Sequence, residues 1–222
     1  MTTLITGATR GVGRALFETY AATGESVIGT HRNPPDTALG AKGRWLRCEM
    51  TDPAQIRALA PAVDPAPLDL LICNAGILLD RNQPLATGYP PTLWAEMFAV
   101  NVTAVFLTIQ ALLPALRRAK GARIAIVSSQ MASSTRASGG SLIYRASKSA
   151  VLNLGRNLAT ELKPEGIAVG IYHPGWVQTD MGGPTAAITA QAAASGLAAR
   201  FAALSPATTG CFETWDGQPM LY

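Results

Sequence analysis

The sequence is poor in the features of nucleic-acid-binding and peripheral membrane proteins. Charged residues make up only 14% of its 222 residues, and 18 basic against 14 acidic side chains leave a net charge of +4. No run of lysine or arginine is dense enough to form a basic patch. We therefore expect no nucleic-acid partner and no membrane partner, and the small positive excess suits an anionic small molecule.

Cysteine and histidine are scarce as well, which argues against disulfide-rich and metal-binding proteins. The three cysteines, Cys48, Cys73 and Cys211, lie far apart, and neither of the two histidines stands at metal-ligand spacing from them. We expect buried reduced thiols and no metal site. The residues after Met1 also lack a signal-peptide pattern, so the sequence predicts a cytoplasmic protein.

Only one apolar run is long enough to cross a bilayer, the uncharged stretch from Met97 to Leu116. It contains polar or helix-breaking residues, namely Asn101, Thr103, Thr108, Gln110 and Pro114. We therefore interpret this stretch as a helix of the protein core.

What the chain does contain is a regular alternation of short β-branched runs with longer segments of helical periodicity. This order predicts an α/β fold of the Rossmann type, a doubly wound parallel sheet of about seven strands with helices on both faces. The length predicts a single domain, 1–222. Expected strands cover 3–6, 26–30, 44–48, 68–73, 123–128, 168–173 and 211–214, and expected helices cover 12–22, 53–60, 92–119, 144–162 and 189–204. Expected loops cover 33–43, 61–67 and 182–184.

A glycine-rich turn follows the first expected strand and opens the first expected helix, with the sequence Thr6-Gly7-Ala8-Thr9-Arg10-Gly11-Val12-Gly13. Glycines permit a tight turn and close backbone approach to a pyrophosphate, and the N–H groups of a helix N-terminus attract its charge. The turn lacks the Gly-Lys-Ser/Thr ending of nucleoside triphosphatases. A turn that packing alone requires is the alternative. The candidate dinucleotide-binding residues here are Gly7, Thr9, Arg10, Gly11, Val12 and Gly13.

The end of the second expected strand bears on the choice of dinucleotide. In dinucleotide folds an acidic residue about twenty positions after the glycines holds the ribose hydroxyls and repels a 2′-phosphate. Here the strand ends Gly29-Thr30-His31-Arg32, without a carboxylate. Arg10 and Arg32 offer guanidinium groups to a 2′-phosphate, which favours NADP(H) over NAD(H). Asp36 is the alternative, and it would serve NAD(H).

A Tyr-x-x-x-Lys pair begins the helix expected at residues 144–162. Four positions apart, Tyr144 and Lys148 share one helix face and can both reach one bound ring. A free phenol titrates at about pH 10, and a nearby ammonium favours the phenolate. We therefore expect Lys148 to lower the pKa of Tyr144, which would make the phenol an acid–base group. A solvated helix face is the alternative for the pair taken alone.

Two further polar positions accompany this pair. Ser128-Ser129 ends the fifth expected strand, and Asn101 lies inside the apolar stretch 98–106. Together with the Gly-x-x-x-Gly-x-Gly turn, this set resembles the short-chain dehydrogenase/reductase superfamily and its Asn-Ser-Tyr-Lys tetrad. The resemblance implies that Ser129 hydrogen-bonds the substrate oxygen and that Asn101 holds a helix open for a water that links Lys148 to solvent. The implied catalytic residues are Asn101, Ser129, Tyr144 and Lys148.

The resemblance assigns further residues to the cofactor. Asn74-Ala75-Gly76 closes the fourth strand, as in the superfamily's Asn-Ala-Gly signature beside the adenosine ribose. Glu49-Met50 stands where the superfamily often has Asp-Val at the adenine, and the glutamate departs from that pattern. After the sixth strand, the implied contacts to the nicotinamide end and the phosphates are Pro174, Gly175, Val177 and Thr179. We interpret the preceding His173 as structural.

Two motifs narrow the resemblance to the sniffer and C-factor-like subgroup of carbonyl reductases. They are Tyr-Arg-Ala-Ser-Lys-Ser-Ala-Val-Leu-Asn from Tyr144 and His-Pro-Gly-Trp-Val from His173. One departure is that the spacing between Ser129 and Tyr144 is longer than in most of the superfamily, which leaves Ser128 as the alternative serine. The resemblance also implies a homodimer or homotetramer, with the helices around 104–116 and 150–162 as candidate interfaces.

The resemblance implies an oxidoreductase that interconverts a carbonyl and an alcohol by hydride transfer with NADP(H). We expect small to medium, partly apolar substrates because Met131, Trp176 and Met181 can line the pocket; packing in the core or at a subunit interface is the alternative for them. A cofactor-binding signalling or interaction protein is the alternative function. An epimerase or dehydratase would need a larger substrate domain than the residues after Met181 provide.

Overall fold

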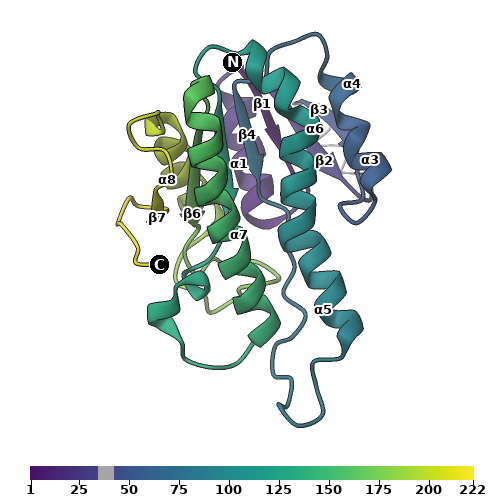
Figure 1. Cartoon of the computed structure of the whole chain (residues 1–222), viewed down its shortest axis with the longest axis vertical. Helices are drawn as coiled ribbons and strands as arrows, with labels where there is room; N and C mark the ends of the chain where they lie inside the picture. Colours follow the sequence, from purple (N-terminus) through teal and green to yellow (C-terminus); the bar gives the residue numbers. More distant parts are fainter. Residues whose placement is uncertain (35–42) are drawn as a thin grey trace.

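The computed structural model describes residues 1–34 and 43–222. Within these residues the strands form one parallel sheet in the order β3-β2-β1-β4-β5-β6-β7 (Figure 1). The doubly wound parallel sheet that the sequence predicts is confirmed. Asp36 and most of the expected loop 33–43 lie outside the described residues. The strands are β1 Thr2–Ile5, β2 Ser26–His31, β3 Arg44–Arg47, β4 Leu70–Cys73, β5 Arg123–Val127, β6 Ala168–His173 and β7 Phe212–Thr214.

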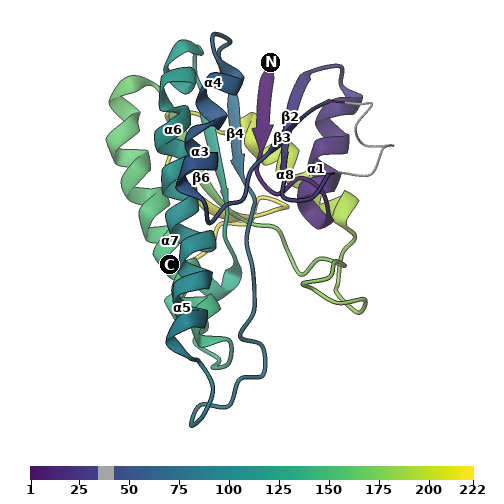
Figure 2. The same cartoon turned by 90° about the vertical axis from the view of Figure 1, so that its right-hand side faces the viewer.

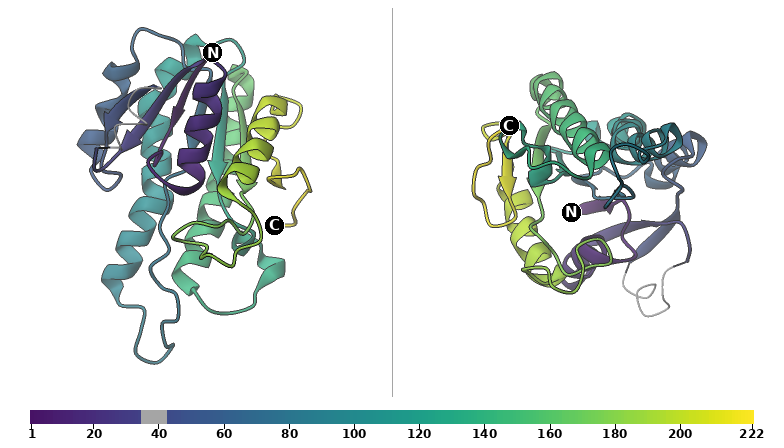
Figure 3. Two further views of the ribbon diagram at one scale, coloured as in Figure 1. Left: turned by 180° about the vertical axis from the view of Figure 1, so that it is seen from behind. Right: turned by 90° about the horizontal axis from the view of Figure 1, so that it is seen from below.

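Helices cover both faces of the sheet. When the sheet is viewed from its edge, α1 and α8 lie on one side and α3, α4, α6 and α7 on the other (Figure 2). The same two layers are visible from below (Figure 3, right). The described helices are α1 Gly11–Ala22, α3 Pro53–Arg57, α4 Leu59–Val63, α5 Pro91–Phe98, α6 Ala104–Arg118, α7 Leu142–Leu162 and α8 Ala190–Ala203.

The core has two layers because successive residues of a strand point to opposite faces of the sheet. In β1, Leu4 packs into the core beneath α6 and α7, whereas its neighbour Ile5 packs into the core beneath α1 and α8. In β4, Leu71 and Ile72 repeat this alternation. Strands that are buried on both faces are continuous apolar runs in the sequence, which is why they were predictable.

Two expected helices differ from the prediction. The helix expected at 53–60 is divided into α3 and α4, and α4 extends into the expected loop 61–67, so that part of the loop prediction is wrong. The reason is that Pro61 lies in the first turn of α4, where a missing backbone N–H costs no helical hydrogen bond. The helix expected at 92–119 is continuous from Pro91 to Arg118, but a π-helical turn, η1 Ala99–Thr103, lies between α5 and α6.

The helical segment Pro91–Arg118 is long and apolar enough to cross a membrane, and half of its most apolar window is buried inside the protein. Leu112 and Leu116 of α6 are fully buried in the core that covers one face of the sheet. These contacts agree with the core helix that the sequence predicts.

The parallel strands bring the loops after their carboxyl ends to one edge of the sheet, the lower edge in Figure 1. At this edge the strand order changes direction between β1 and β4, which are neighbours in the sheet but not in the chain. Open α/β sheets bind their ligands at such a switch point. The loops that follow β1 and β4 are therefore the first place to look for a site.

Candidate active site

The glycine turn after β1 has a backbone that glycine alone adopts easily. Gly7 and Gly11 have φ values of 65° and 55°, in the left-handed region. A Cβ on Gly13 would lie 2.2 Å from the carbonyl oxygen of Gly7. The turn leads into α1, whose N-cap residue Arg10 makes no side-chain cap within the described residues. The N–H groups of this first helical turn are thus available to an anion.

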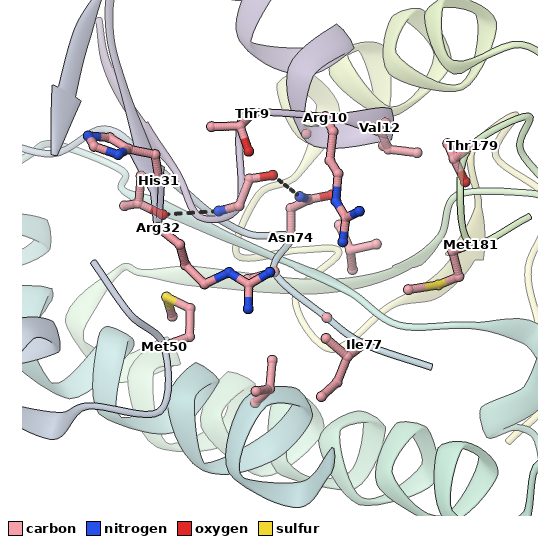
Figure 4. A pocket seen from close by; sticks show the side chains of 18 of the residues that line it. Thr9, Arg10, Val12, His31, Arg32, Met50, Asn74, Ile77, Thr179 and Met181 are labelled. Atoms are coloured by element: carbon pink, nitrogen blue, oxygen red, sulfur yellow. Dashed lines mark hydrogen bonds between the residues drawn. The ribbon is translucent and has the colours of Figure 1, made fainter. Parts of the chain in front are cut away.

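The loop after β4 is tied to this turn by Asn74. Its Nδ2 donates to the carbonyl oxygens of Thr6 at 3.0 Å and Gly7 at 3.1 Å. The Thr6 hydroxyl oxygen accepts from the backbone N–H groups of Asn74 at 3.0 Å and Ala75 at 3.1 Å. Figure 4 shows the Asn74 amide reaching the turn. The Asn-Ala-Gly motif therefore fixes the position of the glycine turn against the centre of the sheet.

A cleft of about 470 Å³ opens along the carboxyl edge between these loops (Figure 4). It is lined by all but two of the predicted cofactor residues: Gly7, Thr9, Arg10, Gly11, Val12, Gly13, Arg32, Glu49, Met50, Asn74, Ala75, Gly76, Tyr144, Lys148, Pro174 and Thr179. Gly175 and Val177 do not line it, because both pack against Ile188. Val177 is paired with Ile188 through a β-bridge, and a Cβ on Gly175 would lie 2.5 Å from the Ile188 Cδ1.

Two arginines border the cleft near the glycine turn. Arg32 follows β2 and extends into the cleft (Figure 4). Arg10 forms an ion pair with Asp180, with 2.9 Å between Nη1 and Oδ2, and the two side chains are 67% and 77% exposed. Such exposed pairs contribute little to stability, so Arg10 can exchange Asp180 for another anion. Asp180 is a cleft residue that the sequence analysis did not identify.

Tyr144 and Lys148 lie on the buried face of α7 and line the same cleft. Only 7% of Tyr144 and 4% of Lys148 are exposed. The Lys148 Nζ lies 5.6 Å from the centre of the Tyr144 ring and donates to the Val127 carbonyl oxygen at 3.0 Å. The structure therefore brings the predicted pair together.

The expected lowering of the Tyr144 pKa is wrong. Burial raises the pKa of Tyr144 to about 12, although its hydrogen bond with the Ser129 side chain lowers it. Burial also lowers the pKa of Lys148 to about 8. The reason for both directions is the same, because a low-dielectric surrounding disfavours the charged form of each group. Tyr144 is therefore a protonated phenol at neutral pH in this structure.

The two serines after β5 have different partners. The Ser129 side chain hydrogen-bonds Tyr144, and its oxygen also accepts from the backbone N–H of Met131 at 3.1 Å. Ser128 lines the cleft, but its hydroxyl donates to the carbonyl oxygen of Lys148 at 3.2 Å. Ser129 is therefore the serine beside the Tyr144 phenol, and Ser128 is the serine beside the Lys148 backbone.

Asn101 lies in the π-helical turn η1 and is almost fully buried, so it does not line the cleft. Its Oδ1 accepts from the backbone N–H of Ile77 at 2.8 Å, and its Nδ2 donates to the Ile77 carbonyl at 2.9 Å and to the Ser147 hydroxyl at 3.0 Å. The widened turn agrees with the expected opening of a helix at this residue. Through these contacts the Asn101 side chain holds the loop after β4.

The sequence analysis missed Asp80, which is fully buried beside Tyr144. Its Oδ2 accepts from the backbone N–H groups of Ile143 at 2.7 Å and Tyr144 at 3.2 Å. The sequence signal that could have found it is an isolated aspartate after the Asn-Ala-Gly motif. Its partners lie more than sixty positions away, and no local pattern predicts that contact.

The residues expected around the substrate lie in different environments. The Met181 Sδ lies 4.0 Å from the Tyr144 hydroxyl oxygen, and Met131 packs with the apolar cluster around the Tyr144 ring. Trp176 is 51% exposed and donates from its Nε1 to the Gly182 carbonyl at 2.8 Å. His173 is buried at the end of β6 and does not line the cleft, in agreement with a structural role. Within residues 1–34 and 43–222 no group of His, Cys, Asp or Glu side chains is arranged to hold a metal ion.

Comparisons with known proteins agree with this geometry. The chain matches the short chain dehydrogenase family over residues 1–189. It is 34% identical to the 3-oxoacyl-[acyl-carrier-protein] reductase FabG of Escherichia coli over 185 residues, which are 80% of this chain and 74% of FabG. It is 36% identical to the C-signal protein of Myxococcus xanthus over 166 residues, which are 73% of this chain and 97% of that protein.

One solved structure has the same fold over the whole length of this chain. NADPH-bound carbonyl reductase from chicken fatty liver superposes with a TM-score of 0.91 and 29% identity, covering 100% of this chain and 98% of that one. These similarities confirm the expected superfamily and agree with the expected relationship to C-factor-like proteins and carbonyl reductases. The chain belongs to the short chain dehydrogenase family.

Proposed function

We propose that the protein is an NADP(H)-dependent oxidoreductase that interconverts a carbonyl compound and an alcohol. The observation that carries the proposal is the single cleft that contains both halves of the chemistry. One part of its lining is the glycine turn with Arg10 and Arg32, and another is the buried pair Tyr144 and Lys148. The glycine turn and the two arginines would hold the dinucleotide, and Tyr144 and Lys148 would act on the substrate in the other part of the cleft.

The residues of the turn fit a dinucleotide. Gly7 and Gly11 have left-handed backbones, and the position of Gly13 has no room for a Cβ. The first turn of α1 offers N–H groups to a pyrophosphate. At the end of β2, Arg32 enters the cleft where a carboxylate would repel a 2′-phosphate. These features support NADP(H), and the similar carbonyl reductase from chicken is NADPH-bound.

Tyr144 is the proposed proton donor and acceptor. When bound, the nicotinamide supplies or accepts the hydride. At neutral pH the Tyr144 phenol keeps its proton, because burial raises its pKa to about 12. The phenol can therefore give that proton to a substrate oxygen during reduction, which leaves a phenolate. In the reverse direction the phenolate form is the one that accepts the proton of an alcohol. The Ser129 hydroxyl, which already meets the phenol, would hydrogen-bond the same oxygen.

Lys148 and Asn101 have supporting roles in the proposal. The Lys148 ammonium is held by the Val127 carbonyl at a short distance from the phenol ring, where its charge favours the phenolate that forms after proton transfer. Asn101 holds Ile77 and Ser147 in place. Pro174 and Thr179 line the cleft and are the proposed contacts from the loop after β6, whereas Gly175 and Val177 would act through the backbone of that loop.

The surroundings of the phenol favour a partly apolar substrate. Met97 and Ile143 are fully buried against Tyr144, and Tyr89, Phe98 and Met131 pack on the same cluster. Met181 lines the cleft, with its Sδ 4.0 Å from the phenol oxygen. We propose aldehydes, ketones or quinones of small to medium size as substrates.

The test is a screen of aldehydes, ketones and quinones in which NADPH and NADH oxidation are followed in parallel. We expect turnover with at least one of these carbonyl classes and a preference for NADPH. Arg32→Asp should weaken NADPH binding much more than NADH binding, because the substitution places a carboxylate near the 2′-phosphate. Equal losses for the two cofactors would contradict the NADP(H) assignment. A complete absence of turnover would contradict the proposed activity.

A signalling or interaction role is the second candidate, and the similarity to C-signal favours it. In that case binding of the cofactor would matter more than turnover. Tyr144→Phe separates the two functions, because it removes the hydroxyl that carries the transferable proton and keeps the aromatic ring. A biological effect that survives in a variant without turnover would support the interaction role.

The cytoplasmic location of the protein and its homo-oligomer, with α6 and α7 as the interface, stay predictions. Sedimentation measures the oligomeric state.

A further inference from the structure

Asp80 is a buried carboxylate that contacts the start of the helix with Tyr144 and Lys148. It lies in the loop after β4 and has no exposed surface. Its Oδ2 accepts from the backbone N–H groups of Ile143 at 2.7 Å and Tyr144 at 3.2 Å. Its Oδ1 is also buried and has no hydrogen-bond partner in the part of the chain that the structure describes.

The first turn of α7 depends on this distant cap. Its own N-cap residue, Ser141, has a φ of 45° and makes no side-chain cap within the described residues. A helix start leaves N–H groups without helical partners, and a carboxylate there also interacts favourably with the helix dipole. Asp80 therefore supplies from another loop the acceptor that the local sequence does not provide.

The peptide of Tyr144 is held from its carbonyl side as well. The Ser147 hydroxyl donates to the Tyr144 carbonyl oxygen at 2.8 Å, and the Asn101 Nδ2 donates to the Ser147 hydroxyl at 3.0 Å. Asn101 in turn binds the backbone N–H and carbonyl of Ile77, in the same loop as Asp80. These contacts form a closed ring around the backbone of the residue that carries the phenol.

We propose that Asp80 is a positioning residue for Tyr144, which it holds at the cleft by capping the first turn of α7. The inference rests on the proposed function, in which Tyr144 transfers the proton. Burial of a carboxylate with one oxygen unpartnered is costly, and an exposed serine or asparagine caps most helices without that cost. The free-energy cost of burying Asp80 has a reason if its hydrogen bonds and its charge act on the reacting phenol of Tyr144.

The charge of Asp80 also reaches the phenol. Burial is the largest cause of the raised Tyr144 pKa, the Ser129 hydrogen bond lowers the pKa, the Asp80 carboxylate raises it, and the Arg81 guanidinium lowers it. The Lys148 ammonium also lies near the ring, 5.6 Å from its centre. Since a neighbouring negative charge disfavours the phenolate, removal of the Asp80 charge must move the Tyr144 ionisation to lower pH.

The variant Asp80→Asn tests this, because it keeps the size and one accepting oxygen but removes the charge. The Tyr144 ionisation is measured as the difference in phenolate absorbance between each protein and its own Tyr144→Phe counterpart. We expect the ionisation to move to lower pH in D80N. With a substrate from the screen, we expect kcat to fall about tenfold and the KM for NADPH to stay unchanged, because a charge-assisted hydrogen bond becomes a neutral one.

Asp52→Asn is the matched control. Asp52 also accepts from two backbone N–H groups at a helix start, those of Ala54 at 2.8 Å and Gln55 at 3.3 Å, but it is the N-cap residue of α3 and has these partners in α3 rather than in α7. We expect D52N to lower the Tm and to leave the Tyr144 ionisation unchanged. A D80N protein that likewise loses only stability, with an unmoved Tyr144 ionisation or an unchanged kcat, would overturn the inference.

The absorbance titration requires no turnover, so it tests Asp80 even if the carbonyl screen fails and the proposed activity is wrong. If D80N does not fold, Asp80→Ser takes its place, since serine is small, carries a polar hydroxyl and has no charge. The same shift of the ionisation to lower pH is expected in D80S, and its absence would overturn the inference.

Discussion

Replacement of His173 by glutamine is expected to make the folded protein more resistant to mild acid. His173 ends β6, is only 8% exposed, and has a buried Nδ1 without a partner among the described residues. Burial, supported by the charge of Arg136 and opposed by Asp216, lowers its pKa from 6.5 to about 4. Because the folded-state pKa is the lower one, stability that is present above the unfolded-state pKa is lost as the pH falls toward the folded-state pKa.

The magnitude follows from this difference in pKa. Each pKa unit corresponds to about 1.36 kcal/mol, so a pKa lowered from 6.5 to about 4 makes about 3 kcal/mol of unfolding free energy sensitive to pH. About 2 kcal/mol of it is lost by about pH 5, where the ring is protonated in the unfolded chain but not in the folded protein. The H173Q variant lacks this loss because glutamine does not titrate.

The assay is urea unfolding of the wild type and H173Q at neutral pH and at about pH 5. Carboxylates also titrate over this range, but they do so in both proteins, so the difference between the two losses isolates His173. Equal losses of unfolding free energy in the two proteins would refute the reasoning, because the acid sensitivity would then belong to other groups.

Two further predictions concern the cleft. Gly13→Ala should abolish NADPH binding in a fluorescence titration and lower the unfolding free energy by about 1–3 kcal/mol, because its Cβ would meet the Gly7 carbonyl at 2.2 Å and the Asn74 amide at 2.4 Å. Lys148→Met should lower kcat by about a hundredfold or more, because the ammonium that favours the phenolate is lost. The same substitution should raise the Tm, because it removes a buried ammonium whose pKa burial has lowered to about 8. An unchanged kcat would contradict the proposed role of Lys148.

The parts of the fold that were predictable are those with a local signal. β4 is the apolar run Leu-Leu-Ile-Cys because both of its faces are buried, and β1 ends in the apolar pair Leu4-Ile5 for the same reason. The strand expected at 68–73 is shorter in the sheet, Leu70–Cys73. The glycine turn was recognisable because its steric demand leaves a spacing that few other structures require. Tyr144 and Lys148 were recognisable because a helix places residues four apart on one face.

The parts that were not predictable depend on contacts between distant segments. Asp80 meets the start of α7 only after β4 and α7 have packed together, so its sequence neighbours do not indicate its role. The sign of the Tyr144 pKa shift depends on burial by the apolar cluster that includes Met97 and Ile143, and the spacing to Lys148 could not show this. The continuation of α4 to Val63 was not predicted because Pro61 suggests a loop unless it lies in a first helical turn.

The central claim is that the Tyr144 phenol transfers the proton at the end of a dinucleotide cleft. The most direct measurement compares the wild type and Tyr144→Phe for NADPH affinity by fluorescence and for the rate of NADPH oxidation with a carbonyl substrate. We predict an unchanged affinity and a rate lowered by about 10²–10⁴-fold, the range that positioned acid–base groups contribute. A variant that oxidises NADPH at the wild-type rate would contradict the claim.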